Sequence, residues 1–168
     1  MWLIKLIGFL AMASCGAYLG HKKSSHYKIR EKILGEIIRL CDSMVNDITY
    51  FQPAVTEMLK KRLNNYSALA PALSDYVELL DNNAVIQIDT LKNQIAKGPL
   101  MDDEFILFIQ LLDILGKSDS QSQRIGITSI KEAFLIKHQA ALDECKKYGG
   151  LYFKLGILGG LTAGVIIL

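Results

Sequence analysis

Two long apolar runs, near either end of this 168-residue chain, constrain its fold more than any other feature. Residues 2–20 carry Lys5 as their only charge, and residues 151–168 carry only Lys154. As a helix, the first run measures about 28 Å, which is close to the hydrocarbon thickness of a bilayer. The sequence therefore predicts transmembrane helices at 1–20 and 151–168, with a domain at 21–150 between them.

The middle segment has the composition of an ordinary folded domain. It contains all 17 acidic residues and all but two of the 19 basic residues, so it is neutral overall. A nucleic-acid-binding protein needs a surplus of Lys and Arg, and this neutrality excludes nucleic acid as a partner. The scattered Cys15, Cys41 and Cys145 exclude a disulfide framework and a CxxC metal or redox motif.

Basic residues next to both apolar runs predict the orientation in a membrane. Only Glu31 opposes the basic series after the first run, and Lys146 and Lys147 precede the second run. Basic residues close to the ends of membrane spans mark the cytoplasmic side. We therefore expect a two-span protein of the cell membrane whose central domain is cytoplasmic. The series after the first run is Lys22, Lys23, Lys28, Arg30 and Lys32.

Three alternative interpretations of the first run stay open. A cleavable signal peptide would have a short apolar region interrupted by Lys5, and no Ala-x-Ala site precedes His21. An exported lipoprotein anchored through Cys15, with its helical domain outside the cytoplasm, is the second, because residues 10–15 loosely resemble a lipidation box. A buried core helix is the third.

The middle segment has a helical hydrophobic pattern throughout. Apolar residues recur every three or four positions from Ile29 to Ile48, and charged residues such as Arg30 and Glu36 fill the other face. No stretch alternates with period two, so the predicted fold class is all-α: a bundle of about six helices between the two membrane helices. The first bundle helix is expected to continue the first apolar run up to Pro53. The others are expected at about 53–64, 71–80, 85–95, 102–115 and 118–148.

The residues expected of an active site are missing from the sequence. Gly116-Lys117-Ser118 resembles the end of a phosphate-binding loop, but position 111 is leucine and the preceding segment is helical rather than a strand. His21, His26 and His138 lack neighbours at metal-binding spacing. We therefore expect no catalytic activity, no metal, no cofactor and no small-molecule substrate.

Small residues at four-residue spacing mark both apolar runs. Gly156, Gly160 and Gly164 form a stripe along the second run, and Gly16 and Gly20 repeat the spacing in the first. Such stripes let helix backbones approach closely in a membrane. They predict helix packing, either between the two runs of this chain or with another membrane subunit.

Several stretches of the chain resemble the stage III sporulation protein AB family of endospore-forming bacteria. The stretches match an acidic-Ile-x-Tyr sequence followed by a proline turn, a Leu-Gly-x-Ser-Asp-x-x-x-Gln stretch, and a final Leu-Gly-x-x-x-Gly-Leu span. One departure is Phe51-Gln52-Pro53-Ala54, where the family usually has Gly-x-Thr-Pro-Leu. The motif residues in this sequence are Asp47, Tyr50, Pro53, Gly116, Ser118, Asp119 and Gln123, with residues 155–161 in the last run.

The resemblance implies a biological role that the composition does not. It implies a helical cytoplasmic domain similar to the F-type platform domain of type II secretion systems. It also implies membership in the mother-cell assembly that connects to the forespore during endospore formation. In that assembly the protein would be a non-enzymatic scaffold beside sibling channel subunits and a cytoplasmic secretion-type ATPase.

An acidic stretch in the middle of the domain is a candidate contact surface for that ATPase. Eight acidic residues lie between Asp75 and Asp113, against Lys92 and Lys97. Complementary charge would orient a basic partner and raise the encounter rate. We hypothesise that Asp102, Asp103 and Glu104 make this contact. The alternative is an acidic surface that only aids solubility.

Overall fold

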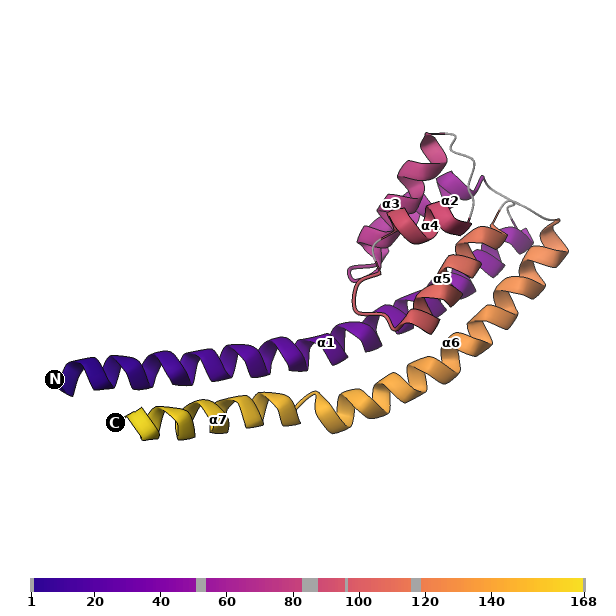
Figure 1. Ribbon diagram of the computed structural model, residues 1–168. Helices are drawn as coiled ribbons and strands as arrows, with labels where there is room; N and C mark the ends of the chain where they lie inside the picture. Colours follow the sequence, from indigo (N-terminus) through magenta and orange to yellow (C-terminus); the bar gives the residue numbers. More distant parts are fainter. Residues whose placement is uncertain (1, 51–53, 83–87, 96, 116–118, 168) are drawn as a thin grey trace. The chain divides into compact units, whose positions relative to one another are not determined.

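The computed structural model describes residues 2–50, 54–82, 88–95, 97–115 and 119–167. The described residues contain helices and no strand, which confirms the all-α prediction (Figure 1). The helices are α1 (Trp2–Tyr50), α2 (Val55–Arg62), the 3₁₀ turn η1 (Leu63–Asn65), α3 (Ala70–Asp81), α4 (Ile88–Gln94), α5 (Asp102–Ile114), α6 (Ser120–Tyr148) and α7 (Leu151–Ile167).

The helix boundaries follow the local signals in the sequence. Helix α1 continues without a break from the first apolar run to Tyr50, as its uninterrupted pattern predicted. Helix α5 begins with Asp102, where negative charge favours the positive end of the helix dipole. Gly98, between α4 and α5, has a φ of 58°, a left-handed conformation that glycine adopts without steric cost.

The structure does not confirm the two predicted transmembrane helices. Among the described residues, no helix combines the length and the apolar character needed to cross a membrane. Both end segments, 1–20 and 151–168, are nevertheless helical over their described residues.

Contacts between residues divide the chain into two compact units. Unit 1 comprises residues 1–31 and 140–168, and unit 2 comprises residues 32–139. The units are defined by contacts between residues. The predicted domain boundaries, after residue 20 and after residue 150, were defined by a membrane, and they stay predictions.

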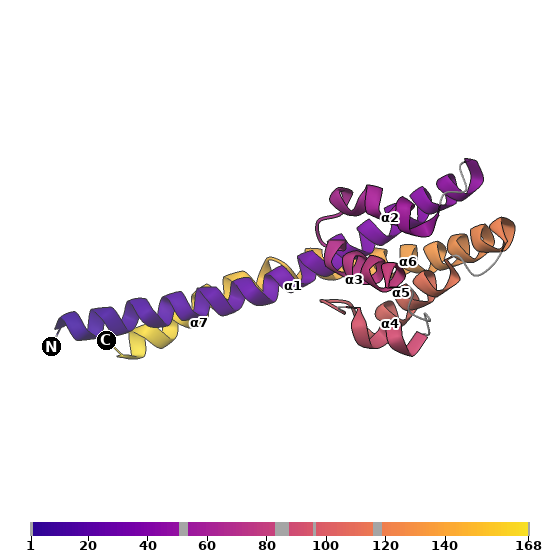
Figure 2. The ribbon, with the colours of Figure 1, turned by 90° about the horizontal axis from the view of Figure 1, so that it is seen from above.

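Unit 1 is a pair of helical arms. Helix α7 runs antiparallel beside the first part of α1, and the start of α1 and the end of α7 lie at the same end of the pair (Figures 1 and 2). Gly149 and Gly150 separate α6 from α7, and the buried Ser24 hydroxyl of α1 donates a hydrogen bond to the Gly149 carbonyl. The guanidinium of Arg30 lies 2.6 Å from the Glu144 carboxylate, so a buried ion pair also joins α1 to α6.

Unit 2 buries one apolar core under its helices. The Tyr76 hydroxyl of α3 donates a 2.9 Å hydrogen bond to the Leu112 carbonyl of α5, and burial raises the pKa of this hydroxyl. Lys131 of α6 pairs with Asp42 of α1 at the surface. The largest fully buried side chains of the unit are Leu34, Ile37, Leu40, Met44, Leu59, Leu69, Leu73, Tyr76, Leu91, Phe108, Ile109 and Phe134.

A buried carboxylate on α1 fixes the start of α3. Glu36, 2% exposed, accepts hydrogen bonds from the amides of Ala68 at 2.9 Å and Leu69 at 2.8 Å, and from the Ser67 amide and hydroxyl at 3.2 Å. These amides belong to the three residues that lead into α3, so Glu36 fixes the turn before the helix, where Leu69 has no side-chain acceptor of its own. The sequence pattern placed Arg30 and Glu36 on the exposed face, which is wrong: both are buried because each has a distant polar partner.

Replacing Glu36 by alanine should destabilise the protein strongly. The substitution leaves the buried Leu69 amide and the part-buried donors of Ser67 and Ala68 without their acceptor, and we expect a loss of about 2–4 kcal/mol in the free energy of unfolding. Urea unfolding of the full chain in detergent, followed by circular dichroism, measures this loss. Glu78→Ala, an exposed change on α3 itself, is the matched control and should cost less than about 0.5 kcal/mol. Equal stability of the two variants would contradict the role of Glu36 as the hydrogen-bond acceptor for the turn before α3.

Candidate functional site

The five glycines spaced four residues apart in the two apolar runs lie at the contact between α1 and α7. A Cβ atom built on Gly16 would lie 2.5 Å from the Gly156 carbonyl oxygen and 2.7 Å from the Cα of Gly160. A Cβ on Gly20 would lie 2.7 Å from the Tyr152 carbonyl oxygen, so neither position has room for a side chain. Of the two alternatives for the stripe, the structure therefore has packing between the two runs of this chain.

The glycine contact continues along α7. A Cβ on Gly160 would lie 3.0 Å from the Met12 carbonyl oxygen, and one on Gly164 would lie 2.6 Å from the Phe9 ring. Gly159 points elsewhere, because a Cβ there meets nothing within 4 Å. An open groove of about 480 Å³ follows the contact, and Cys15 and Gly159 are among its lining residues.

Aromatic and basic side chains gather at one end of the glycine contact. The rings of Tyr27 and Tyr152 stack with centroids 5.8 Å apart and an angle of 6° between them, and Tyr148 packs against both. The ammonium of Lys23 lies 5.9 Å from the centre of the Tyr152 ring, and that of Lys147 lies 5.2 Å from the Tyr148 ring. Both distances suit cation–π attraction. Tyrosine and lysine together are typical of the boundary between lipid and water.

Replacing Gly156 by leucine should separate α1 from α7. The new side chain would collide with the Gly16 carbonyl, 2.5 Å from its Cβ, and we expect a loss of about 1–3 kcal/mol from overpacking. Thermal unfolding of the full chain in detergent measures it.

Gly159→Leu is the matched control for this variant. Its Cβ meets open space on the same helix, and it brings the same gain in helix propensity. It should unfold at or above the wild-type temperature. A similar loss in both variants would show that the glycine contact does not hold the pair together.

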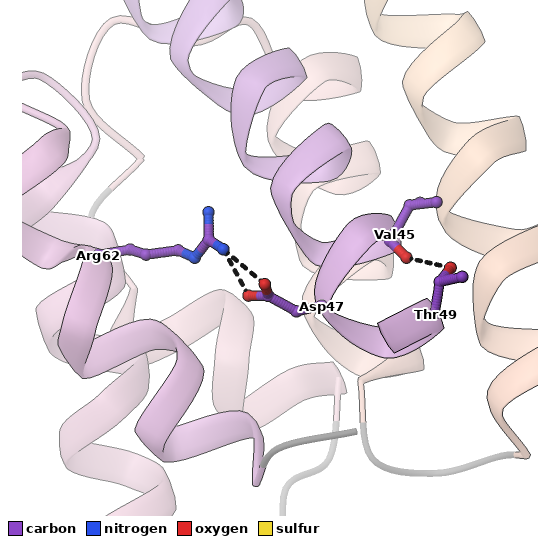
Figure 3. A network of polar contacts seen from close by, with 4 residues as sticks. All are labelled: Val45, Asp47, Thr49 and Arg62. Carbon is purple, nitrogen blue, oxygen red and sulfur yellow. Dashed lines mark hydrogen bonds and ion pairs between the residues drawn. The ribbon is translucent and has the colours of Figure 1, made fainter. Parts of the chain in front are cut away.

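The acidic-Ile-x-Tyr motif lies at the end of α1. One Nη atom of Arg62, at the end of α2, lies 2.7 Å and 2.6 Å from the two carboxylate oxygens of Asp47 (Figure 3). This half-buried ion pair joins the ends of α1 and α2. Tyr50, the last residue of α1, is exposed, and Pro53 lies outside the described residues.

The second motif lies at the start of α6. The Asp119 carboxylate accepts hydrogen bonds from the amides of Gln121 and Ser122, both at 3.0 Å, and so caps the helix. A hydrogen bond from the Ser122 hydroxyl, aided by these amides, lowers the pKa of Asp119. The Gln123 amide donates to the Asp119 carbonyl at 3.0 Å, within the first turn of α6. Gly116 and Ser118 lie outside the described residues.

The three acidic residues of α5 do not form one exposed surface. Glu104 is only 1% exposed, and its carboxylate accepts a 2.9 Å hydrogen bond from the Met101 amide at the start of the helix. Asp102 pairs with Lys97 and Asp103 with Lys137, whose hydrogen bond lowers the pKa of Asp103. Burial removes Glu104 from the proposed contact surface, and the two lysines offset the charge of the exposed pair.

The candidate nucleophiles and ligands take packing positions. The described residues contain no group of three or more His, Cys, Asp or Glu that could hold a metal ion. His21 packs edge-on against Phe153, and the His138 ring lies against Gly35. Burial, reinforced by the neighbouring Asp42 carboxylate, raises the pKa of the Cys41 thiol to about 12.

The raised pKa of Cys41 predicts slow alkylation. At pH 8 the folded thiol is protonated, and only the thiolate is nucleophilic. In a Cys15→Ser, Cys145→Ser variant, iodoacetamide should therefore modify Cys41 at least about 100-fold more slowly in the folded protein than in urea. Mass spectrometry over time measures both rates. Comparable rates would show an accessible, reactive thiol.

The residues that sequence reasoning missed are the buried polar ones. Glu36 and Arg30 were read as part of the solvated face, and Ser24 was not singled out. One signal was present: Glu36 lies three residues after Ile33 and four before Leu40, at helical spacing with the apolar face. Its partners lie 31 to 33 residues away, which no local pattern indicates.

These features define the class of the protein: an all-α protein in which a glycine-packed helix pair is joined to a helical domain. The profile of the family described as stage III sporulation protein AB matches residues 5–168 of the chain. The chain therefore belongs to the stage III sporulation protein AB family, and this membership implies a role in sporulation. No curated protein and no solved structure gives a significant match.

Proposed function

We propose that the protein is a non-catalytic membrane platform subunit of the secretion-like complex between mother cell and forespore, and that endospore formation requires it. The observation that carries this proposal is the α1–α7 contact, in which glycines bring together the two end segments of the chain, 2–20 and 151–168, each of which carries a single charged residue. Close packing through small residues is how helices associate where lipid provides no hydrophobic drive.

The surface of the helix pair supports a lipid environment. Apolar side chains on the outer sides of both helices are largely exposed, with Leu10 57%, Leu158 59% and Val165 66% exposed. A continuous apolar surface of this kind is unfavourable in water and favourable in lipid. The cluster of Tyr27, Tyr148, Tyr152, Lys23 and Lys147 suits the boundary between lipid and water. Its basic side chains can reach anionic lipid headgroups there.

The basic residues next to the pair support a cytoplasmic domain. Lys22, Lys23 and Lys28 follow the first apolar run on α1 and are exposed, and so are Lys146 and Lys147 at the end of α6. Under the positive-inside rule, both flanks lie on the cytoplasmic side. The helical domain then faces the mother-cell cytoplasm, where a secretion-type ATPase and sibling subunits can reach it.

The lipoprotein alternative has less structural support. Cleavage before Cys15 would remove residues 1–14, which include Phe9, Met12 and Ala13. Gly160 packs against Met12 and Ala13, and Gly164 packs against Phe9. Export and cleavage would therefore remove the residues of α1 that Gly160 and Gly164 of α7 pack against.

Thiol labelling in intact sporulating cells tests the topology. Ser74, an exposed position on α3, is replaced by cysteine in a chain whose native cysteines are serine. A membrane-permeant maleimide should label it, and an impermeant maleimide should label it only after the cells are lysed. Labelling of intact cells by the impermeant reagent would contradict the cytoplasmic domain and favour the lipoprotein.

Complementation of a deletion strain tests the role in sporulation. The wild-type chain and Gly159→Leu should restore heat-resistant spores, whereas Gly156→Leu should give at least about tenfold fewer, since its helix pair is disturbed. Immunoblots of the membrane fraction control for protein level. Full spore counts from Gly156→Leu would contradict a platform that depends on the helix pair.

A further inference from the structure

A second groove lies in unit 2, between the last turns of α1 and the first half of α6. It encloses about 340 Å³ and lies outside the residues of the family motifs described above. Its lining combines apolar, hydroxyl and charged side chains: Val45 from α1, and Gln121, Arg124, Ile125, Thr128, Ser129 and Glu132 from α6.

One hydrogen-bond donor of Arg124, in this groove, has no acceptor among the described residues. Its Nε–H is buried, and no hydrogen-bond acceptor reaches it within the part of the chain that the structure describes. A buried donor without an acceptor costs free energy, and for a guanidinium the best acceptor is a carboxylate. The groove therefore suits a partner that supplies a carboxylate next to Arg124.

The face of α6 beside the groove exposes two isoleucines among polar side chains. Ile125 is 63% exposed and Ile136 is 75% exposed, and both lie on the same side of the helix as Thr128 and Ser129. The Thr128 hydroxyl already donates to the Arg124 carbonyl at 2.8 Å, so it needs no further acceptor. Short side chains between two isoleucines leave room for another helix to lie close.

The charged residues on this face are arranged symmetrically about Thr128, which suits pairing with an identical helix. Arg124 lies four residues before Thr128, and Glu132 lies four residues after it. In an antiparallel pair of identical helices crossing at Thr128, each Arg124 stands opposite the other copy's Glu132. A two-fold axis makes such a contact self-complementary, so both ion pairs form together.

We propose that this groove and face bind a second copy of the chain, with the two α6 helices antiparallel and crossing at Thr128. The carboxylate that Arg124 lacks in one copy is Glu132 of the other. Lys131, the nearest other cation on the helix, is held by Asp42 of its own α1 and does not compete for Glu132. The contact involves only unit 2 and does not depend on how the ends of the chain meet a membrane.

Charge exchange tests the pairing. The full chain is purified in detergent, and its mass is measured by light scattering over a range of concentrations. Wild-type protein should be a dimer, and Arg124→Glu and Glu132→Arg should each raise the dimer dissociation constant at least tenfold. The double variant, which exchanges both charges, should return it to within about threefold of wild type, because each new pair is again opposite in sign.

Three outcomes would overturn the proposal. The first is a monomeric wild type at every concentration, which would leave the groove to another carboxylate-bearing partner. The second is single variants that dimerise as wild type does. The third is a double variant no better than the single ones, while circular dichroism shows all variants to be folded.

Disulfide trapping tests the crossing point in membranes. Thr128→Cys, in a chain with serine at positions 15 and 145, places two identical thiols at the proposed axis. Mild oxidation should give a covalent dimer from Thr128→Cys and little from Gln110→Cys, an exposed position on α5. Equal yields from both variants, or no dimer from either, would contradict an axis at Thr128.

Discussion

The close approach of α1 and α7 depends on five positions that carry no side chain. At Gly16, Gly20 and Gly156 a single Cβ atom would lie within about 3 Å of the opposite backbone. This constraint fixes which faces of the two helices meet and where they meet. In this arrangement Tyr27 on α1 stacks on Tyr152 on α7, and the ammonium of Lys23 lies near the same Tyr152 ring.

The helical domain depends on a different kind of contact, in which one residue satisfies several distant backbone groups. Glu36 accepts hydrogen bonds from the amides of the turn before α3, and the Tyr76 hydroxyl of α3 donates to one carbonyl, that of Leu112, near the end of α5. The bonds from the Leu69 amide and from the Tyr76 hydroxyl are buried, and a buried hydrogen bond is costly to lose. Apolar contacts have no preferred direction, whereas these hydrogen bonds join particular atoms of different helices.

Periodicity and helix breakers made the helices predictable, because both act over a few residues. The continuous α1, the start of α5 at Asp102 and the glycine stripe all follow from local spacing. The cap of α6 by Asp119 likewise lies within a few residues of the amides that it accepts, in a motif that the sequence already marked. What could not be predicted is the role of Glu36, because its partners lie 31 to 33 residues away in the sequence.

We propose that the two ends of one chain pair through their glycines in the membrane of the sporulating cell. Cys15 and position 159 line the same groove, and Gly159 has room for a side chain. A Gly159→Cys chain with serine at positions 41 and 145 should therefore be cross-linked by a short bifunctional thiol reagent in native membranes. The account predicts a cross-link within single chains, seen as a monomer of altered mobility and confirmed by mass spectrometry. Cross-links only between chains, or none at all, would contradict it.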